Sequence, residues 1–232
     1  MAPLSVVGQS VYRKDASPKI TGRALHVGNI EMPGMLHVAV LRSPYPHARI
    51  LRIDKSRAEK LAGVAAVLTG AEIAEMPGVD AHFGPAFRDQ PILCVEKACY
   101  VGDPVVAVAA ADRRTAEDAL EIIDVEYEPL PAVSDVLEAV KPASPLVHEQ
   151  HRAAKAFADL AHVKAGQRSN ICYHFKLRLG DVDRAFAEAD RIFEDTFSSP
   201  PAQHMPMEPH VSLAYVDEQG RLNIWTASQS PS

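Results

Sequence analysis

Residues 203–210, which read Gln-His-Met-Pro-Met-Glu-Pro-His, contain three side chains that could bind a metal ion. His204, Glu208 and His210 offer the nitrogen and oxygen ligands that zinc uses in proteins. The two prolines between them exclude a helix, so the three cannot be stacked on one helical face. In an extended strand they would share one side but spread over about 20 Å, at ~3.3 Å per residue. We therefore predict no metal site here, and expect these side chains to bond backbone groups at a buried crossing between strands.

Gln229 is the second candidate for chemistry, because it follows an apolar run that ends at Trp225. Its amide offers two hydrogen-bond donors and one acceptor. At the end of a buried strand this amide must find partners, and an oxo group on a buried cofactor would satisfy its donors. The alternative is a frayed, solvent-exposed end of the chain, which is the favoured interpretation on the residues alone.

The other polar clusters have structural explanations. Asp181 with Asp183 is better explained by helix capping, and Glu194 with Asp195 by solvation of a strand face. The sequence contains no G-x-G-x-x-G, P-loop, H-E-x-x-H or G-x-S-x-G motif. Phosphate-binding loops, zinc protease sites and hydrolase nucleophiles therefore have no support.

Arg42, His47 and Arg49 flank a proline-rich turn and could bind an anion. A solvated turn, or a turn that faces an interface, is the favoured interpretation. The three cysteines, Cys94, Cys99 and Cys172, form no C-x-x-C pair. We expect packing thiols in a reducing cytoplasm.

The elements that must position these residues alternate between strand and helix in the first part of the chain. Short apolar runs ended by turn residues predict strands over 35–41, 50–53 and 64–68. Asp54 can cap a helix over 55–62 that Gly63 would end. Thr69 opens a further helical turn.

The clearest unit is residues 100–128. Val105–Ala110 is a continuous apolar run, which is typical of a strand buried on both faces. Asp112 then caps a helix over 113–123, and residues 124–127 return as a strand, so the stretch predicts a compact α/β unit. One face of this helix carries apolar residues at helical spacing, namely Ala116, Ala119, Leu120 and Ile123.

Residues 129–170 are rich in proline and alanine and predict an extended linker with a helical turn around 153–160. A second block follows. Strands are expected over 171–179 and 191–197, with a helix over 182–189 between them. Residues 211–216 and 222–227 flank Asp-Glu-Gln-Gly, which is a good hairpin turn.

Composition excludes several classes of function. The chain has 232 residues, of which 47% are hydrophobic and 23% charged, and this is ordinary for a globular protein. The net charge is −6 and Lys and Arg form no cluster, so nucleic acid is not an expected partner. The longest purely apolar run, 105–111, is too short to span a bilayer, and no secretory signal is evident.

A set of segments in fixed order carries a further signal. They are Lys19–Ala24, Met35–His37, Arg42–Ile50, Gly63–Gly70, Tyr100–Val108, Glu126–Pro131, Gly180–Phe186, Gln203–Pro209 and Trp225–Gln229. Together they resemble the N-terminal part of the large, molybdopterin-binding subunit of the xanthine dehydrogenase / aldehyde oxidase family of molybdenum hydroxylases. The resemblance covers nearly the whole chain.

This resemblance implies an α/β (α+β) fold. Residues 18–130 would form the family's α/β hammerhead domain after an N-terminal extension over 1–17. Residues 131–170 would be a linker, and residues 171–232 would form the first strands of the molybdenum-cofactor-binding domain.

The resemblance also implies an activity. The family hydroxylates aldehydes or N-heteroaromatic rings with oxygen from water, and electrons leave through [2Fe-2S] clusters, usually to FAD. The family's glutamine near the molybdenum oxo ligand matches Gln229, which would make it the cofactor-binding residue. The iron–sulfur clusters and FAD are expected on partner subunits.

Parts of the family pattern are absent, namely the glycine-rich loop beyond Gln229, the later cofactor-binding stretches and the catalytic glutamate. No catalytic residue is therefore expected on this chain, and it should not be active alone. Three interpretations stay open: one part of a split enzyme completed by a second chain, an inert truncated fragment, and a stand-alone hammerhead binding module.

Overall fold

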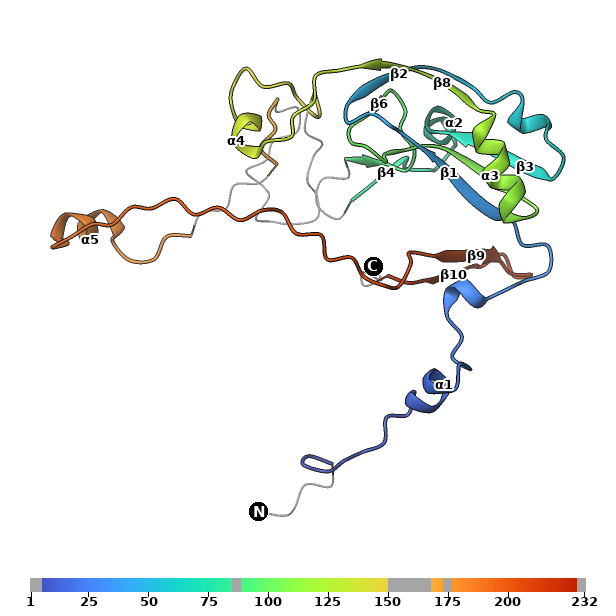
Figure 1. Cartoon of the computed structure of the whole chain (residues 1–232), viewed down its shortest axis with the longest axis horizontal. Helices are drawn as coiled ribbons and strands as arrows, with labels where there is room; N and C mark the ends of the chain where they lie inside the picture. Colours follow the sequence, from blue (N-terminus) through green and yellow to red (C-terminus); the bar gives the residue numbers. More distant parts are fainter. Residues whose placement is uncertain (1–5, 85–88, 150–167, 173–176, 229–232) are drawn as a thin grey trace. The chain divides into compact units, whose positions relative to one another are not determined.

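A computed structural model describes residues 6–84, 89–149, 168–172 and 177–228 (Figure 1). The chain divides into two compact units, residues 34–190 and residues 1–33 with 191–232. In the first unit the strands are β1 (His37–Arg42), β2 (Ala48–Asp54), β3 (Val64–Thr69), β4 (His82–Phe83), β5 (Gln90–Pro91), β6 (Lys97–Ala98), β7 (Pro104–Ala110) and β8 (Asp124–Pro129). Its helices are η2 (Ala58–Lys60), α2 (Gly70–Glu75), α3 (Arg113–Glu121), α4 (Val136–Ala139) and α5 (Val182–Glu188).

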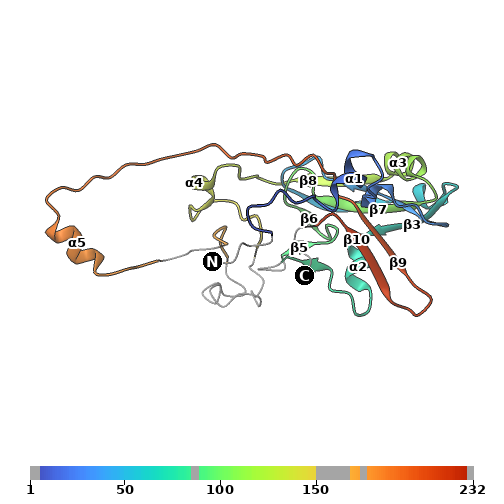
Figure 2. The ribbon, with the colours of Figure 1, turned by 90° about the horizontal axis from the view of Figure 1, so that it is seen from below.

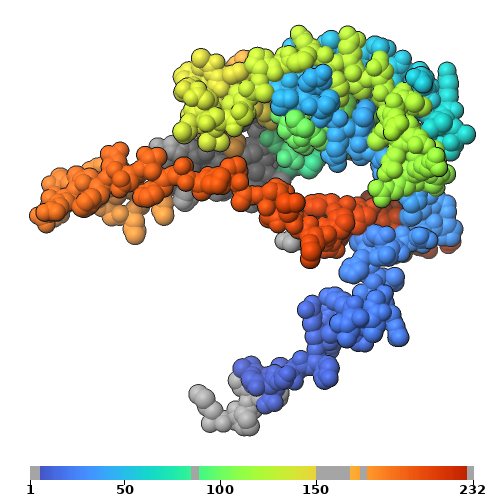
Figure 3. Space-filling model, in the orientation of Figure 1, coloured from blue at the N-terminus to red at the C-terminus, as the bar shows by residue number. Residues whose placement is uncertain are grey.

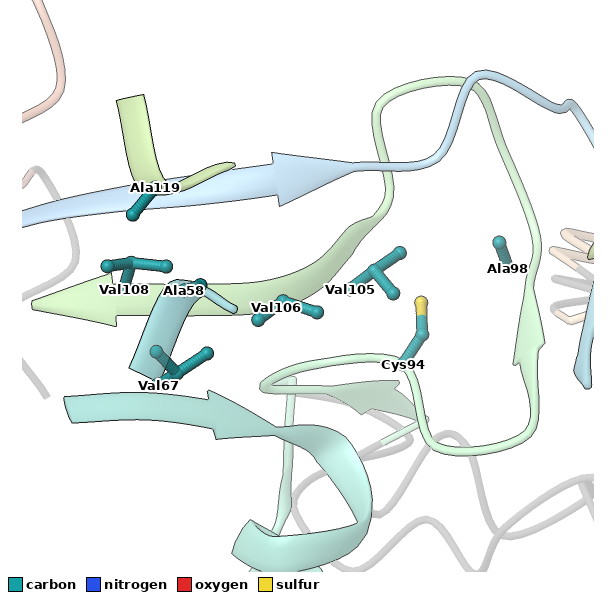
Figure 4. Close-up of a cluster of buried hydrophobic side chains, with 8 residues drawn as sticks. All are labelled: Ala58, Val67, Cys94, Ala98, Val105, Val106, Val108 and Ala119. Atoms are coloured by element: carbon teal, nitrogen blue, oxygen red, sulfur yellow. The ribbon is translucent and has the colours of Figure 1, made fainter. Parts of the chain in front are cut away.

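The core of this unit forms around β7. This strand lies between β1 and β3 in an antiparallel sheet of order β1-β7-β3. Val105, Val106 and Val108 are fully buried, as the continuous apolar run predicts (Figure 4). Because β7 is paired on both edges and buried on both faces, it is the element on which the other strands are registered.

Helix α3 packs on the same sheet through the apolar face that its spacing predicts. The Asp112 side chain caps the helix by accepting from the backbone N–H of Thr115 at 2.8 Å. Ala116 and Ala119 are fully buried. The helix ends at Glu121, and the following strand β8 pairs with β2 in a second antiparallel sheet of order β6-β2-β8. The strand–helix–strand stretch therefore connects two sheets.

The predicted helix over 55–62 is much shorter in the structure, where only the three-residue 3-10 helix η2 forms. The Lys55 side chain leaves the local chain and donates to the carbonyl oxygen of Val67 at 2.8 Å. It also pairs with Glu59 and Glu72. These contacts connect the start of the segment to β3 and α2.

Helix α2 begins with a capping box, in which the Thr69 hydroxyl and the Glu72 side chain satisfy each other's backbone N–H groups. Gly70, its first residue, lies against the backbone of the loop before β6. A Cβ atom at Gly70 would stand 2.3 Å from the carbonyl oxygen of Cys94 and 2.5 Å from that of Leu93. The position therefore requires glycine for space.

The second unit contains α1 (Ala16–Ile20), η1 (Val27–Asn29), β9 (Ser212–Val216) and β10 (Leu222–Thr226). The predicted hairpin is confirmed (Figures 1 and 2). The strands predicted over 171–179 and 191–197 are wrong within the described residues of those segments, which have no strand partner. Phe193 and Phe197 are more than four-fifths exposed. No helix among the described residues is both long and apolar enough to cross a bilayer.

Replacing Val106 with Asp should unfold the first unit. An unpaired charge on this buried strand costs several kcal/mol, which approaches the total stability of a small domain. Val38→Asp is the matched control, because Val38 lies on the adjacent strand and is 66% exposed. Thermal unfolding followed by circular dichroism should show loss of the transition only for Val106→Asp. A Val106→Asp protein that melts with the parent would contradict the central place of β7.

Replacing Gly70 with Ala should destabilise the same unit by about 1–3 kcal/mol, the usual cost of overpacking. The new methyl group would meet two carbonyl oxygens of the backbone, which cannot rotate away. Gly28→Ala is the control, because nothing lies within 4 Å of a Cβ atom there. Urea unfolding of the two variants should separate them, and equal midpoints would show that the loop at 93–94 yields easily.

Candidate functional site at the end of the hairpin

The β9–β10 hairpin is the element that leads the chain towards Gln229. Its antiparallel register pairs Val216 with Leu222 and Ser212 with Thr226. The rings of Tyr215 and Trp225 stack on one face, with their centroids 5.6 Å apart. Register matters here, because a slip of one residue would move every side chain of β10 to the opposite face.

Asp217 fixes the turn of the hairpin. Its carboxylate accepts from the backbone N–H of Gln219 at 3.0 Å and of Arg221 at 2.9 Å. The Arg221 guanidinium donates to it at 2.8 Å, and the Asn223 amide at 3.3 Å. The backbone bond from Arg221, with the other donors, lowers the pKa of Asp217 below its ordinary value of 3.8. The sequence indicates a turn at Asp217 but does not predict that one carboxylate accepts all four bonds.

The open end of the hairpin is closed by two further contacts. The hydroxyl groups of Ser212 and Thr226 lie 2.8 Å apart, and the backbone N–H of Ala227 donates to the carbonyl oxygen of Val211 at 3.2 Å. The register is therefore fixed from both ends, and the chain beyond Thr226 stays beside the chain before Ser212.

A hollow of about 720 Å³ lies at this end of the hairpin. Its lining is rich in imidazole and hydroxyl groups, and consists of His204, Pro206, Glu208, His210, Val211, Ser212, Thr226, Ala227 and Ser228. The structure thus brings the three candidate ligands of the 203–210 segment to one place. Met205 has a left-handed backbone, with φ of 40°, so the segment does not run straight as an extended strand would.

The hollow is not arranged as a metal centre. Within the described part of the chain, no group of three or more His, Cys, Asp or Glu side chains is placed to hold a metal ion. The lining instead offers hydrogen-bond donors and acceptors around an open space, an arrangement that suits a polar group with many oxygen atoms. Gln229 itself lies outside the described residues, and Ser228 on the rim is the residue before it.

The Arg42–Arg49 turn uses its polar groups within the fold. Arg42 donates to the carbonyl oxygen of Gly102 at 2.8 Å, and Arg49 pairs with Glu128. His47 is buried, and its Nδ1 lies 2.7 Å from the carbonyl oxygen of Pro131. Each of the three side chains thus has a partner within the fold, whereas Nε2 of His47 is buried and has no hydrogen-bond partner among the described residues.

Among the remaining candidates, Asp181 has the capping role that the sequence predicts, whereas Glu194 and Asp195 lie in a segment that forms no strand, so the predicted strand face is wrong. The Asp181 side chain accepts from the backbone N–H of Arg184 at 3.0 Å and caps α5. Asp183 pairs with Arg178 at the surface, and Glu194 and Asp195 are exposed.

All three cysteines are free thiols, and burial raises the pKa of Cys94 and of Cys99. Raised values leave both thiols protonated, as is typical of packing residues.

Comparison with known families gives two matches. Residues 21–131 match the family described as "Aldehyde oxidase and xanthine dehydrogenase, a/b hammerhead domain". Residues 163–232 match the "Molybdopterin cofactor-binding domain".

Similar proteins agree with these matches. A probable xanthine dehydrogenase subunit of Bacillus subtilis is 34% identical over 95% of this chain, which covers 27% of that protein. The nicotinate dehydrogenase large molybdopterin subunit of Eubacterium barkeri is 32% identical over 97% of this chain, which covers 48% of that protein. The chain thus spans between about a quarter and a half of these relatives.

Solved structures show the same fold. The quinoline 2-oxidoreductase of Pseudomonas putida 86 superposes with a TM-score of 0.74 at 32% identity, over 97% of this chain and 27% of that chain. A reconstituted CO dehydrogenase from Oligotropha carboxidovorans gives a TM-score of 0.79 at 30% identity, and the match covers 97% of this chain and 28% of that chain.

Acid should weaken the hairpin. Because the pKa of Asp217 is lowered in the folded state, its stabilising effect is complete above the ordinary value of 3.8 and is lost as the pH falls through the lower folded value. Trp225 is the only tryptophan, so its fluorescence reports on the hairpin. Asp217→Asn should change this signal at pH 7 and remove part of the acid response, whereas Glu218→Gln in the same turn should not. Identical titrations of the parent and Asp217→Asn would contradict the role of Asp217.

Proposed function

The chain belongs to the xanthine dehydrogenase / aldehyde oxidase family of molybdenum hydroxylases, and on that premise we propose that it is part of an oxidoreductase that hydroxylates an aldehyde or an N-heteroaromatic substrate. The hammerhead match and the cofactor-domain match occur in one chain in the family's order. The relatives are molybdopterin oxidoreductases or subunits of them.

The observation that carries the proposal is the hollow at the end of the register-locked hairpin. It lies within the residues that match the cofactor-binding domain. Its imidazole and hydroxyl side chains, from His204, His210, Ser212 and Thr226, fit the polar rim of a molybdopterin group. That cofactor, when bound, supplies the metal-centred hydroxylation chemistry.

Gln229 is the residue proposed to face the cofactor. It follows Ser228 in the sequence, and Ser228 lines the hollow. Its amide would donate a hydrogen bond to an oxygen of the bound group and so stabilise charge that develops there.

The chain is proposed to act with other polypeptides. One would carry the remainder of the cofactor-binding domain, and iron–sulfur and FAD subunits would take the electrons onwards. The exposed Phe193, Phe197 and Met207 support this, because large apolar side chains that are exposed together often mark a contact surface. The segment that carries them is coloured orange in Figure 3. The three free thiols fit a cytoplasmic location.

An alternative is a stand-alone hammerhead binding module or an inert fragment. The observation that favours it is that residues 34–190 contain a hydrophobic core of their own. The two proposals differ in whether the chain, combined with the remainder of a family large subunit, retains molybdenum cofactor.

The test is a Gln229→Ala variant in such a reconstituted, molybdenum-loaded complex. Loss of one donor from a desolvated site should lower kcat by roughly 10²–10³, or about 3–4 kcal/mol. Molybdenum content should not change, because the amide would contribute to the reaction more than to retention of the cofactor.

Gln219→Ala is the matched control, because Gln219 is an exposed glutamine in the hairpin turn. Turnover of Gln229→Ala at the parent rate would remove Gln229 from the site. A complex that never retains molybdenum would favour the binding-module alternative.

A further inference from the structure

We propose that residues 131–149 form a strap that opens and closes over one face of the first unit, and that Lys97 and Asn170 are the two latches that hold it shut. The strap begins after the end of β8, contains α4 and returns to β6 at Val147 (Figure 1). The proposal is independent of the proposed function, because it concerns a movement within one unit and needs no cofactor.

Three side chains that face the strap lie on one side of the sheet of order β6-β2-β8. Strands β2 and β6 pair antiparallel with Arg49 opposite Lys97. Two residues further along this register, His47 lies opposite Cys99. Because alternate residues of a strand point the same way, His47, Lys97 and Cys99 share one side of the sheet. Ala98 points to the other side and is fully buried in the core.

Both ends of the strap are bound to this side of the sheet. Nδ1 of His47 lies 2.7 Å from the carbonyl oxygen of Pro131. The Lys97 ammonium donates to the carbonyl oxygen of Val147 at 2.7 Å, and to the two oxygens of the Glu149 carboxylate at 2.7 and 2.9 Å. The Lys97 side chain is only 14% exposed, so its ammonium depends on the strap for these acceptors.

Asn170 is the second latch. Its side-chain oxygen accepts from the backbone N–H of Val147 at 2.9 Å. Its amide nitrogen donates to the carbonyl oxygen of Ala139 at 3.0 Å and to that of Pro145 at 2.9 Å. One side chain thus binds three backbone groups of the strap.

The strap is held by these polar contacts rather than by apolar packing. No residue between 131 and 149, a stretch that the structure describes in full, is buried. The apolar residues in and beside α4, Val136, Leu137 and Val140, are 77%, 73% and 55% exposed. An element with few buried apolar contacts opens locally at a lower free energy than the whole unit unfolds. We therefore expect the strap to open while the core around β7 stays folded.

The closed strap also leaves one polar atom without a partner. Nε2 of His47 is buried and has no hydrogen-bond partner among the described residues. A buried polar atom without a partner raises the free energy of the closed state. Movement of Pro131 away from the ring would admit water to it, and this gain offsets part of the loss of the latches.

Cys99 reports on the position of the strap. Its Sγ atom lies 3.6 Å from the carbonyl oxygen of Val147 and the residue is half-buried, whereas Cys94 is 1% exposed and Cys172 is exposed. The test is labelling of the full chain with iodoacetamide under native conditions, followed by mass spectrometry of the three cysteine peptides. Cys172 should react first, Cys99 more slowly through opening of the strap, and Cys94 last, through unfolding of the unit.

Low concentrations of urea separate the two kinds of opening. Labelling of Cys99 should change little with urea, because opening of the strap exposes little surface. Labelling of Cys94 should rise steeply with urea, because it requires exposure of the core.

Two variants remove the latches one at a time. Lys97→Met keeps the aliphatic stem and removes the ammonium, and Asn170→Ala removes three hydrogen bonds without altering β6. Each should raise the rate of Cys99 labelling by at least about 10-fold, as expected for loss of a charge-assisted bond or of several neutral ones. Lys60→Met and Asn29→Ala are the matched controls and should label as the parent does, because both residues are exposed and neither lies on β6 or in the strap.

Circular dichroism confirms that each variant is folded before its rates are compared. Parent rates at Cys99 in both latch variants would overturn the assignment of the latches. Labelling of Cys99 and Cys94 together, with the same dependence on urea, would overturn the strap, because only global unfolding would then expose Cys99. Labelling of Cys99 in the parent as fast as Cys172 would also overturn it, because the strap would then not be closed.

Discussion

The pairing of β7 on both edges, with burial of both its faces, is the constraint on which the rest of the larger unit depends. Val106 lies opposite Leu41 of β1 and opposite Thr69 of β3, so one residue fixes the register of three strands. Thr69 is also the cap of α2, and the same β7 supports α3. Small and branched side chains on β7 let both neighbouring strands and the helix approach closely.

A second constraint is a set of backbone hydrogen bonds that joins loops far apart in the sequence. The backbone N–H of Ser43 donates to the carbonyl oxygen of Asp103, and that of Gly102 donates to the carbonyl oxygen of Ser43. The turn at 43–47 then reaches the end of β8, where the backbone N–H of Leu130 donates to the carbonyl oxygen of His47. The Arg42–Ile50, Tyr100–Val108 and Glu126–Pro131 segments are therefore joined to one another by backbone hydrogen bonds between their loops.

The sequence predicts this structure well wherever the signal is local. The two-face burial of β7, the capped face of α3 and the hairpin around Asp217 each follow from residues within one short window. The helix over 55–62 fails because Lys55 bonds to Val67 and Glu72, which are distant in sequence. The strands predicted over 171–179 and 191–197 are absent from the described residues of those segments, because an apolar run forms a strand only where a neighbouring strand supplies its hydrogen bonds. At the candidate site, the predicted buried crossing between strands at His204, Glu208 and His210 is wrong, because these residues are exposed, lie outside any strand and line an open hollow.

The two units differ in how far they bury their apolar side chains. Residues 34–190 contain a hydrophobic core. The hairpin has an exposed apolar face and an open hollow at one end, and Phe193 and Phe197 in the preceding segment are exposed. The polar contacts of the hairpin are nevertheless complete, from Asp217 at the turn to Ser212 and Thr226 at the open end. A hairpin whose register is fixed from both ends keeps a constant set of side chains on each face, because a slip of one residue would exchange the two faces. The same hydrogen bonds hold Ser212 and Thr226 beside each other at the hollow, so the faces of the hairpin and the lining of the hollow depend on one set of contacts.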